Sequence, residues 1–325
     1  MSSNVFDNIN VEDEIAEKEN TANNNGASFD VESWKQKKRD DVENAFALVD
    51  EAAGELNTYD MLHQWLDVRA RFDRYSVSNT LLIASQAPDA LKLASYKDWQ
   101  DQGIQVNKGE TSLIIFDKIK RYTKADGTTG KQYQTKKVFD IRQTDAKTYP
   151  DAVSVDPVIV MRGLVKASPV KLVIDNEANA SLGAMYSRDD NMIHVPKMLG
   201  EYPKEALLSM LGEITRLRAM GNGYKKIPTP EESKRAAFHA YCVSYIVCRH
   251  FGIELQNKKE NMYVPTMFAD MSPADIRAHL DVISKDANNI IYVIDKARGA
   301  IVPKNKDSDA QTNPNNTAKK ADTPR

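Results

Sequence analysis

The sequence predicts an α+β protein in which N-terminal helices with a small antiparallel sheet are followed by a second α+β domain. Apolar residues recur at helical spacing up to residue 103, whereas residues 104–141 hold short β-branched runs separated by Gly-containing turns. A proline-containing stretch over 145–168 separates these elements from Leu172-Val173-Ile174, which opens another apolar region. At 325 residues the chain is long enough to bury two hydrophobic cores.

Composition favours a cytoplasmic globular protein. The chain is 41% hydrophobic and 28% charged, and no apolar run approaches the roughly 20 residues that span a bilayer. Its N-terminus is acidic and lacks the basic and apolar segments of a signal peptide. Cys242 and Cys248 lie on one predicted helix, which favours buried free thiols in a reducing cytoplasm. We therefore expect no membrane partner.

Charge and proline divide the chain into four parts. Residues 1–30 carry seven acidic residues against Lys18 alone, and so polar a segment is predicted to be a disordered acidic tail. Residues 31–150 are predicted to form the first domain, residues 151–303 the second, and residues 304–325 a disordered tail. Residues 61–150 carry fifteen Lys and Arg against ten Asp and Glu, an excess that is compatible with binding a polyanion.

Caps and breakers place the helices of the first domain. The first helix is expected to start near Val31, and the second to carry an apolar face. Ser76 has the position of an N-cap for a third helix that Pro88 ends, and Ser95 caps a short helix that Gly103 terminates.

Strands are predicted at two places in the first domain and one in the second. Leu113–Phe116 and Lys137–Ile141 read as strands that a hydrophilic hairpin over 125–130 connects. In the second domain, residues 185–196 read as a hairpin. Three long helices are expected after it, over residues 207–216, over residues 236–248, and from Pro273 through Ile294.

The helix over residues 207–216 looks like a metallopeptidase helix without its histidines. The motif H-E-x-x-H places two imidazoles one turn apart on one face, and its Glu acts on the metal-bound water. Here the first histidine position holds Gly212, which has no donor atom, and the second holds Arg216, a permanent cation that would repel zinc. Only Glu213 remains, and its spacing allows it to pair with Arg216.

Cations interleaved with tyrosines mark the candidate DNA-binding residues. Single-strand binding needs cations that follow the phosphates and flat rings on which bases stack. The candidates are Arg69, Arg71, Arg74, Tyr75, Asn79, Lys108, Lys118, Lys120, Arg121, Tyr133, Lys136 and Lys137. Trp65, Phe72 and Trp99 are assigned to the core. A structural alternative stays open, because Tyr75 and Asn79 can close a helix cap and hairpin lysines can protect a strand edge.

Two sets of motifs resemble the ArdC-type (LtrC-like) antirestriction proteins of conjugative elements. The first set is Arg71-Phe72-Asp73-Arg74-Tyr75-Ser76-x-x-Asn79-x-Leu81-Leu82-Ile83-x-x-Gln86-x-Pro88, Trp99-x-x-x-Gly103, Val106-x-Lys108-Gly109-Glu110 and Val138-Phe139-Asp140-Ile141-x-Gln143-Thr144. The second set is the order of hairpin, helix and long helix in the second domain. The resemblance covers most of residues 45–255.

The resemblance implies a single-stranded-DNA-binding domain joined to a degenerate zinc-metallopeptidase-like domain. The family's third metal ligand would fall at Tyr241, so Gly212, Glu213, Arg216 and Tyr241 are expected to be vestigial positions with no catalytic residue, metal or cofactor. Tyr241 is expected to offer its hydroxyl to Glu213. The implied function is a DNA-binding accessory protein of a conjugative or other mobile element that protects incoming DNA from host restriction. The implied partners are single-stranded DNA, with double-stranded DNA as the alternative, and host restriction or conjugation proteins.

Two other functions stay open at this point. The chain could be an active metallopeptidase acting on a host protein, which its zinc content would test, or a non-enzymatic protein-interaction module. His194 and His239 are the candidates for a displaced metal site, but no carboxylate or Cys falls at ligand spacing from them. His63, His250 and His279 are expected to be structural or exposed.

Overall fold

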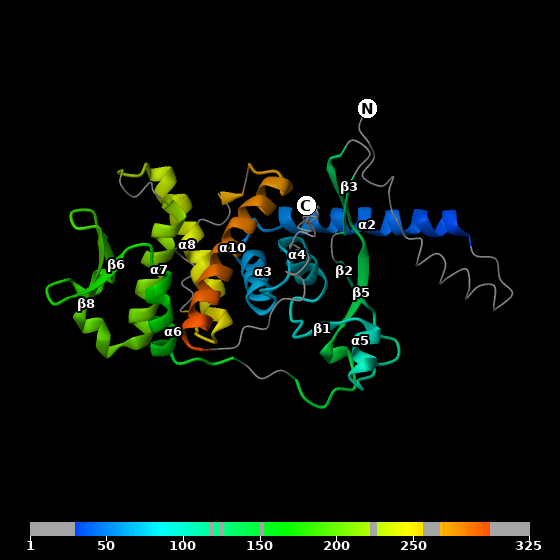
Figure 1. The fold of residues 1–325 in the computed structure, drawn as a ribbon, viewed down its shortest axis with the longest axis horizontal. Helices are drawn as coiled ribbons and strands as arrows, with labels where there is room; N and C mark the ends of the chain where they lie inside the picture. The colour runs from blue at the N-terminus through cyan, green and yellow to red at the C-terminus, as the bar shows by residue number, and fades with distance from the viewer. Residues whose placement is uncertain are drawn as a thin grey trace, which may run out of the picture.

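The computed structural model describes residues 30–117, 120–123, 127–149, 153–221, 226–255, 267–268 and 270–299. The fold is α+β, as predicted. Helices lie in the middle of the molecule, with the strands of the first domain on one side and the small sheet of the second domain at the other end (Figure 1). The two predicted tails lie outside the described residues, apart from Asp30.

The helices of the first domain begin at the predicted caps. The hydroxyl of Ser76 accepts the N–H of Asn79 at 3.2 Å, and that of Ser95 accepts the N–H of Asp98 at 3.1 Å. Both caps are therefore confirmed. The helices are α2 (Val31–Gly54), α3 (Tyr59–Arg71), α4 (Val77–Gln86) and α5 (Tyr96–Asp101). Trp65, Phe72 and Trp99 are buried, as assigned.

The first domain has a three-stranded antiparallel sheet and a separate two-stranded ribbon. The sheet has the order β1-β5-β2, from Leu93–Ala94, Thr135–Asp140 and Leu113–Phe116. The predicted hairpin is the ribbon of β3 (Lys120–Thr123) and β4 (Thr129–Gln132), which lies between β2 and β5 in sequence. Helices α2 and α4 pack on β2, and the 3₁₀ turn η1 (Ile141–Gln143) follows β5.

Two side-chain amides of α4 pair with the edge of β2 that faces away from β5. Asn79 donates to the carbonyl of Phe116 at 2.9 Å and accepts its N–H at 2.8 Å. Gln86 makes the same two hydrogen bonds with Ile114, each at 2.9 Å. Residues seven apart share a helix face and residues two apart share a strand edge, so one face of α4 replaces a neighbouring strand. The edge is thereby closed to other strands.

The second domain places a mixed three-stranded sheet beside long helices. β6 (Lys171–Asp175) pairs in parallel with β8 (Met192–Pro196), and β7 (Met185–Ser187) pairs antiparallel with β8 as the predicted hairpin. The helices are α6 (Pro157–Leu164), α7 (Pro203–Met220), α8 (Pro230–His250) and α10 (Pro273–Ala297), with the short turns η2 (Val165–Ala167), η3 (Ala180–Leu182) and η4 (Lys197–Glu201). Among the described helices, none is long and apolar enough to cross a membrane.

The two predicted domains share a continuous core. α10 packs on α6 and α8 and also on α2 and α4 of the first domain, and α3 packs on α8. Asp67 of α3 accepts the hydroxyl of Tyr245 at 3.0 Å and the Nε of Arg249 at 2.7 Å, both from α8. The boundary near residue 150 therefore stays a prediction from sequence.

Candidate nucleic-acid interface

Two of the candidate DNA-binding residues have structural roles instead. Arg69 is 1% exposed and donates hydrogen bonds to Ser284 Oγ at 2.9 Å and Asn288 Oδ1 at 2.8 Å, and to two main-chain carbonyls. Burial lowers its pKa to about 10, so the guanidinium keeps its charge at neutral pH. Asn79 is 9% exposed, and its side-chain amide is hydrogen-bonded to the main chain of Phe116 in β2. Both side chains lie on the buried faces of their helices, so their contact with DNA stays a prediction that this burial opposes.

The two candidate tyrosines lie at the rim of the core. Tyr75 is half-buried and packs edge-on against Phe72, with ring centroids 5.5 Å apart. Burial raises the pKa of its hydroxyl. Tyr133 is also half-buried, with ring centroids 5.0 Å from Phe46 and 5.9 Å from Phe116. Only the outer part of each ring is left for stacking with a base.

Five of the candidate cations whose side chains are described are exposed: Arg71, Arg74, Lys108, Lys136 and Lys137. Lys136 and Lys137 are neighbours on β5, and successive side chains of a strand point to opposite faces. The two lysines therefore do not form one basic face. Lys136 lies 3.9 Å from Asp117, a distance typical of a weak exposed ion pair.

Two further candidate cations belong to the ribbon. Lys120 and Arg121 are on β3, where the register places them opposite Gln132 and Lys131. Lys118 lies outside the described residues.

Two other arginines, Arg142 and Arg249, lie near enough to Arg71 to act on its charge, and only Arg71 of the three was a candidate. The guanidinium of Arg71 donates to the carbonyls of Ala90, at 3.0 Å, and Pro88. Burial, and then the like charges of Arg249 and Arg142, lower the pKa of Arg71. The carboxylates of Asp67 and Asp89 raise it in part. We call Arg71, Arg142 and Arg249 the arginine cluster.

Each guanidinium of the arginine cluster is held in place. Arg142 donates to Asp140 at 2.6 Å and Arg249 to Asp67 at 2.7 Å, while the side chains of Arg142 and Arg249 stay 39% and 45% exposed. Fixed, exposed guanidinium groups suit phosphate oxygens. This cluster could not be predicted from the sequence, because its members are far apart along the chain.

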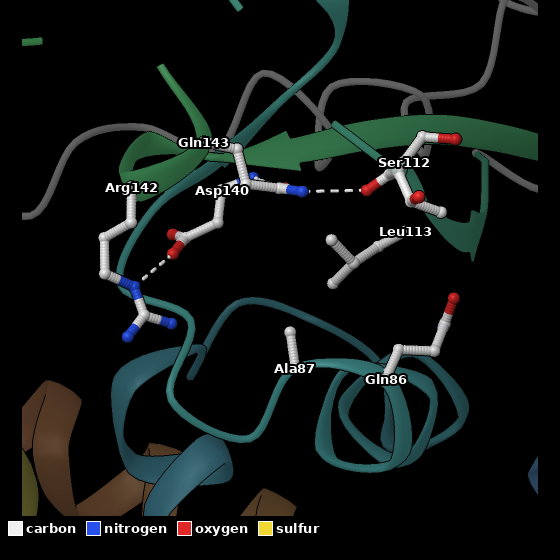
Figure 2. Close-up of a pocket in the computed structure, with 8 residues that line it drawn as sticks. Gln86, Ala87, Ser112, Leu113, Asp140, Arg142 and Gln143 are labelled. Atoms are coloured by element: carbon white, nitrogen blue, oxygen red, sulfur yellow. Dashed lines mark hydrogen bonds and ion pairs between the residues drawn. The ribbon is translucent and has the colours of Figure 1, made fainter. Parts of the chain in front are cut away.

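A pocket of about 590 Å³ lies beside Arg142, between the end of α4, the start of β2 and η1 (Figure 2). Asp140 accepts hydrogen bonds from two backbone N–H groups as well as from Arg142. Gln143 donates to the carbonyl of Thr111 at 2.8 Å and accepts the N–H of Asp140 at 2.8 Å. The polar groups of this wall thus hold the end of β5, and Arg142 is the one lining residue with a permanent charge.

The second domain holds Glu213 in a paired, buried position. Arg216 donates to both carboxylate oxygens of Glu213, at 2.8 and 2.6 Å, and the N–H of Tyr186 donates to it at 2.8 Å. The Glu213 side chain is only 9% exposed. The predicted pairing of Glu213 with Arg216 is confirmed, and it neutralises the carboxylate where the peptidase motif would use it on water.

Tyr241 does not contact Glu213 in the predicted way. Its hydroxyl lies 2.6 Å from Nε2 of His63 on α3, while Nδ1 of His63 lies 2.7 Å from the carbonyl of Tyr59. A carbonyl can only accept, so Nδ1 donates to it, and the neutral tautomer that does so leaves Nε2 to accept from Tyr241. The prediction that Tyr241 serves Glu213 is wrong, because α8 turns this residue towards α3.

Arg216→Ala is expected to lower the free energy of unfolding by about 1–2 kcal/mol. The change strands the Glu213 carboxylate, but a 39% exposed Arg216 is worth less than a fully buried partner. The matched control is Arg235→Ala, because Arg235 pairs with Glu231 at 3.3 Å on an exposed helix face and should contribute at most about 0.5 kcal/mol. Equal unfolding curves for the two variants in urea would contradict the structural importance of the Glu213 pair.

His194 of β8 bridges two carboxylates at the end of the mixed sheet. Its Nδ1 lies 2.8 Å from Asp175 and its Nε2 lies 2.8 Å from Asp190. These hydrogen bonds raise the pKa of His194 and lower the pKa of both carboxyl groups. The bridge is therefore strongest when the imidazole is protonated and both acids are ionised.

We expect this bridge to make stability fall as pH rises above neutrality. The contribution of His194 is fully present below the ordinary histidine pKa of about 6.5 and is lost as pH rises through its raised pKa. The two carboxylates contribute stability above their ordinary pKa of about 3.9, and this stability is lost as pH falls through their lowered pKa values. Thermal unfolding at pH 6.0 and 8.5 should show this loss in the wild type and a smaller one in His194→Gln. An identical pH dependence in both proteins would contradict it.

The histidines considered for a displaced metal site belong to separate clusters. His194 is bonded to Asp175 and Asp190, whereas Nε2 of His239 lies 3.1 Å from Asp286. Asp286 is also paired with Arg218. Across the described part of the chain, no group of three or more His, Cys, Asp and Glu side chains is placed to hold a metal ion.

Comparison with known proteins finds a family model that matches most of the first domain. Residues 58–149 match the family model of the N-terminal domain of anti-restriction factor ArdC. An uncharacterized protein of Bacillus anthracis, pXO2-81, is 24% identical over an alignment of 234 positions, and the match covers 57% of this chain. The chain spans only 39% of the length of that relative.

Two solved structures resemble this one. The Mn(II)-bound crystal structure of the antirestriction protein ArdC from plasmid R388 aligns with a TM-score of 0.52 at 13% identity, over 78% of this chain and 99% of that one. Its metal-free structure aligns with a TM-score of 0.46 at 16% identity, over 69% and 85% of the two chains. The first of these shows that the fold is shared.

Proposed function

We propose that this chain, an ArdC-type protein by the match of residues 58–149 and by its fold, binds single-stranded DNA and protects the incoming DNA of a mobile element from host restriction. The match of the first domain is the observation that carries this proposal. The exposed cations Arg74, Lys108, Lys136 and Lys137 lie within the matched segment, and so do Arg71 and Arg142 of the arginine cluster. Cations of this kind follow phosphates without reading sequence.

Salt dependence of binding tests the DNA proposal. Affinity for an oligothymidylate should fall with salt with a log–log slope of about −0.7 for each phosphate contact. Lys136→Ala/Lys137→Ala should weaken binding and reduce that slope by about 0.7 for each lysine that contacts a phosphate. Lys166→Ala/Lys171→Ala is the matched control, because both lysines are exposed on the second domain. No binding at micromolar protein, or binding indifferent to salt, would refute the proposal.

Protection against restriction is tested in cells. A plasmid that encodes the protein should transfer into a restricting recipient more often than the same plasmid without it. Transfer into a recipient that lacks the restriction system is the control, since both plasmids should enter it equally well. Equal transfer of the two plasmids into the restricting recipient would refute the antirestriction part of the proposal and leave the DNA-binding part standing.

The second domain is, in the same proposal, an inactive peptidase-like scaffold. The Mn(II) of the plasmid R388 protein raises the question of a metal here, but the residues at the motif positions do not fit one. Gly212 has no donor atom, and the guanidinium of Arg216 lies 2.6 Å from Glu213, where a second cation would be repelled. If Glu213 bound a metal instead, its ion pair with Arg216 would be broken.

Restoring the two histidines tests the scaffold proposal. A Cβ atom at Gly212 would meet nothing within 4 Å, so Gly212→His/Arg216→His can be accommodated. We expect no peptidase activity from this variant, because Tyr241 at the third ligand position is bonded to His63. Elemental analysis of the wild type after dialysis against Zn(II) or Mn(II) should find less than one ion per chain. One ion per chain, with proteolysis that a chelator abolishes, would instead establish the active peptidase.

A further inference from the structure

One face of the β1-β5-β2 sheet is covered at its ends and open between them. Side chains alternate along β5, so Val138 points into the core while Lys137 and Phe139 point to the other side, which we call the outer face. Phe46 of α2 packs on Tyr133 just before β5, with ring centroids 5.0 Å apart, and α5 packs on the other end of the strand. Figure 1 shows α2 and α5 at opposite ends of β5. Between them Lys137 is exposed and Phe139 is half-buried.

Two aromatic rings lie together on this outer face. The ring of Tyr96, at the start of α5, meets the ring of Phe139 edge-on, with centroids 6.4 Å apart and an angle of 71° between the planes. Tyr96 is 51% exposed, whereas the sequence candidates Tyr75 and Tyr133 are half-buried. Phe139 therefore orients a ring that stays half open to solvent. Neither Tyr96 nor Phe139 was a candidate from the sequence.

A lysine lies beside the two rings. Lys137 precedes Phe139 by two residues on the same face of β5, a separation of roughly 6.8 Å along the strand. Its partner across the ladder is the neutral residue Ile114. Among the residues that the structure describes, the Lys137 side chain forms no hydrogen bond and no ion pair. Its ammonium group can therefore meet a phosphate. We call Tyr96, Lys137 and Phe139 the aromatic platform.

The acidic residues of the flanking helices are not paired with this lysine. On α5 they are Asp98 and Asp101, which follow Tyr96 by two and five residues and so lie about 200° and 140° around the helix from it. On α2 the acidic residue nearest in sequence to the contact with the sheet is Glu43. Within the described part of the chain, none of the three forms an ion pair with Lys137. The aromatic platform therefore keeps its positive charge.

We propose that the aromatic platform is the surface on which bases of a single-stranded nucleic acid stack. Rings on an open sheet face hold unpaired bases, and a neighbouring cation holds the phosphate, so the platform supplies both parts of such a site. Tyr96, Lys137 and Phe139 all lie within residues 58–149, the segment that matches the family model. Bases in a duplex are already stacked on one another, so this surface favours single strands over double strands. The inference rests on the proposed DNA binding.

Replacing Tyr96 with Leu tests the inference in the full chain. Leu still packs on Phe139 but offers no flat ring, so affinity for an oligothymidylate should fall about fivefold or more. The log–log salt slope should stay unchanged, because a neutral ring neutralises no phosphate. Tyr96→Phe keeps the ring and should bind as the wild type does. The matched control is Tyr292→Leu, since Tyr292 on α10 has the same 51% exposure and should not affect binding. Urea unfolding checks that every variant is folded under the binding conditions.

Two further ligands show whether Tyr96 meets a base. An oligonucleotide of abasic sites keeps the phosphates and removes the bases, so the wild type and Tyr96→Leu should bind it equally. A duplex of the same length hides its bases, so the two proteins should bind it equally as well. The effect of Tyr96→Leu should therefore be confined to the oligothymidylate, and the variant should show a smaller preference for single strands than the wild type.

The outcomes separate this inference from the proposal on which it rests. If the wild type does not bind the oligothymidylate at all, both fail. If the wild type binds with a steep salt dependence and Tyr96→Leu binds as Tyr292→Leu does, only the aromatic platform is overturned. Tyr96→Phe binding as weakly as Tyr96→Leu would assign the effect to the hydroxyl and overturn stacking. An equal loss of affinity for the abasic oligonucleotide would overturn it too, because no base is then involved.

Discussion

Replacing Arg69 with Ala is expected to lower the free energy of unfolding by about 3–5 kcal/mol. The guanidinium joins α3 to two residues of α10, Ser284 at 2.9 Å and Asn288 at 2.8 Å. It also donates to the carbonyl of Phe72 at 2.9 Å, where α3 ends. Alanine would leave these acceptors without a donor in a site that water does not reach, and would add a cavity. Urea unfolding followed by circular dichroism measures the loss.

Two variants separate the structural role of Arg69 from a loss of charge. Arg74→Ala removes the same charge from an exposed residue five positions later and should change stability by less than about 0.5 kcal/mol. Arg69→Lys keeps the charge but has one donor head, so it should fall between the wild type and Arg69→Ala. An Arg69→Ala protein as stable as the wild type, but with weakened DNA binding, would restore the role that the sequence suggested.

The sequence predicted local features well because local residues determine them. Hydroxyls at Ser76 and Ser95 satisfy the first N–H groups of α4 and α5, so these caps could be read directly. The β7–β8 hairpin likewise follows from adjacent segments. The parallel pairing of β6 with β8 could not be predicted, because it depends on packing between segments about 20 residues apart.

The roles of individual polar residues were harder to predict. Arg69 lies four residues after Trp65, and Asn79 lies four residues before Ile83, so helical spacing places both with buried residues. Because both side chains are polar, we expected them at the surface. The residues that satisfy their hydrogen bonds come from α10 and β2, which the sequence does not place beside them. Helical spacing therefore predicted the burial of these residues better than their polarity did, because neighbouring elements supply hydrogen-bond partners for the buried polar groups.

Sites formed by residues from distant segments could not be predicted from the sequence. The arginine cluster takes Arg142 from η1, which follows β5, and Arg249 from the end of α8, and the packing of α8 on α3 brings Arg249 to Arg71. The same packing turns Tyr241 towards His63.

Asn79→Ala is expected to lower the free energy of unfolding by about 2–3 kcal/mol. The variant leaves the N–H and the carbonyl of Phe116 buried without partners, and each such group costs about 1–3 kcal/mol. Gln86→Ala is the matched control on the same helix face. Its hydrogen bonds to Ile114 are exposed to solvent, so water can replace them and the loss should be below about 1 kcal/mol.

Hydrogen exchange at Phe116 gives this prediction a local readout. The Phe116 amide donates to Asn79 at 2.8 Å in the wild type, so it should exchange faster in Asn79→Ala than in Gln86→Ala. Asn79→Asp should be no more stable than Asn79→Ala at neutral pH, because a carboxylate cannot donate to the Phe116 carbonyl and repels it. At low pH the neutral acid can donate again, so the Asp variant should gain stability relative to the Ala variant as pH falls. A Phe116 amide that stays protected in Asn79→Ala would show that α4 closes the edge of β2 by packing alone.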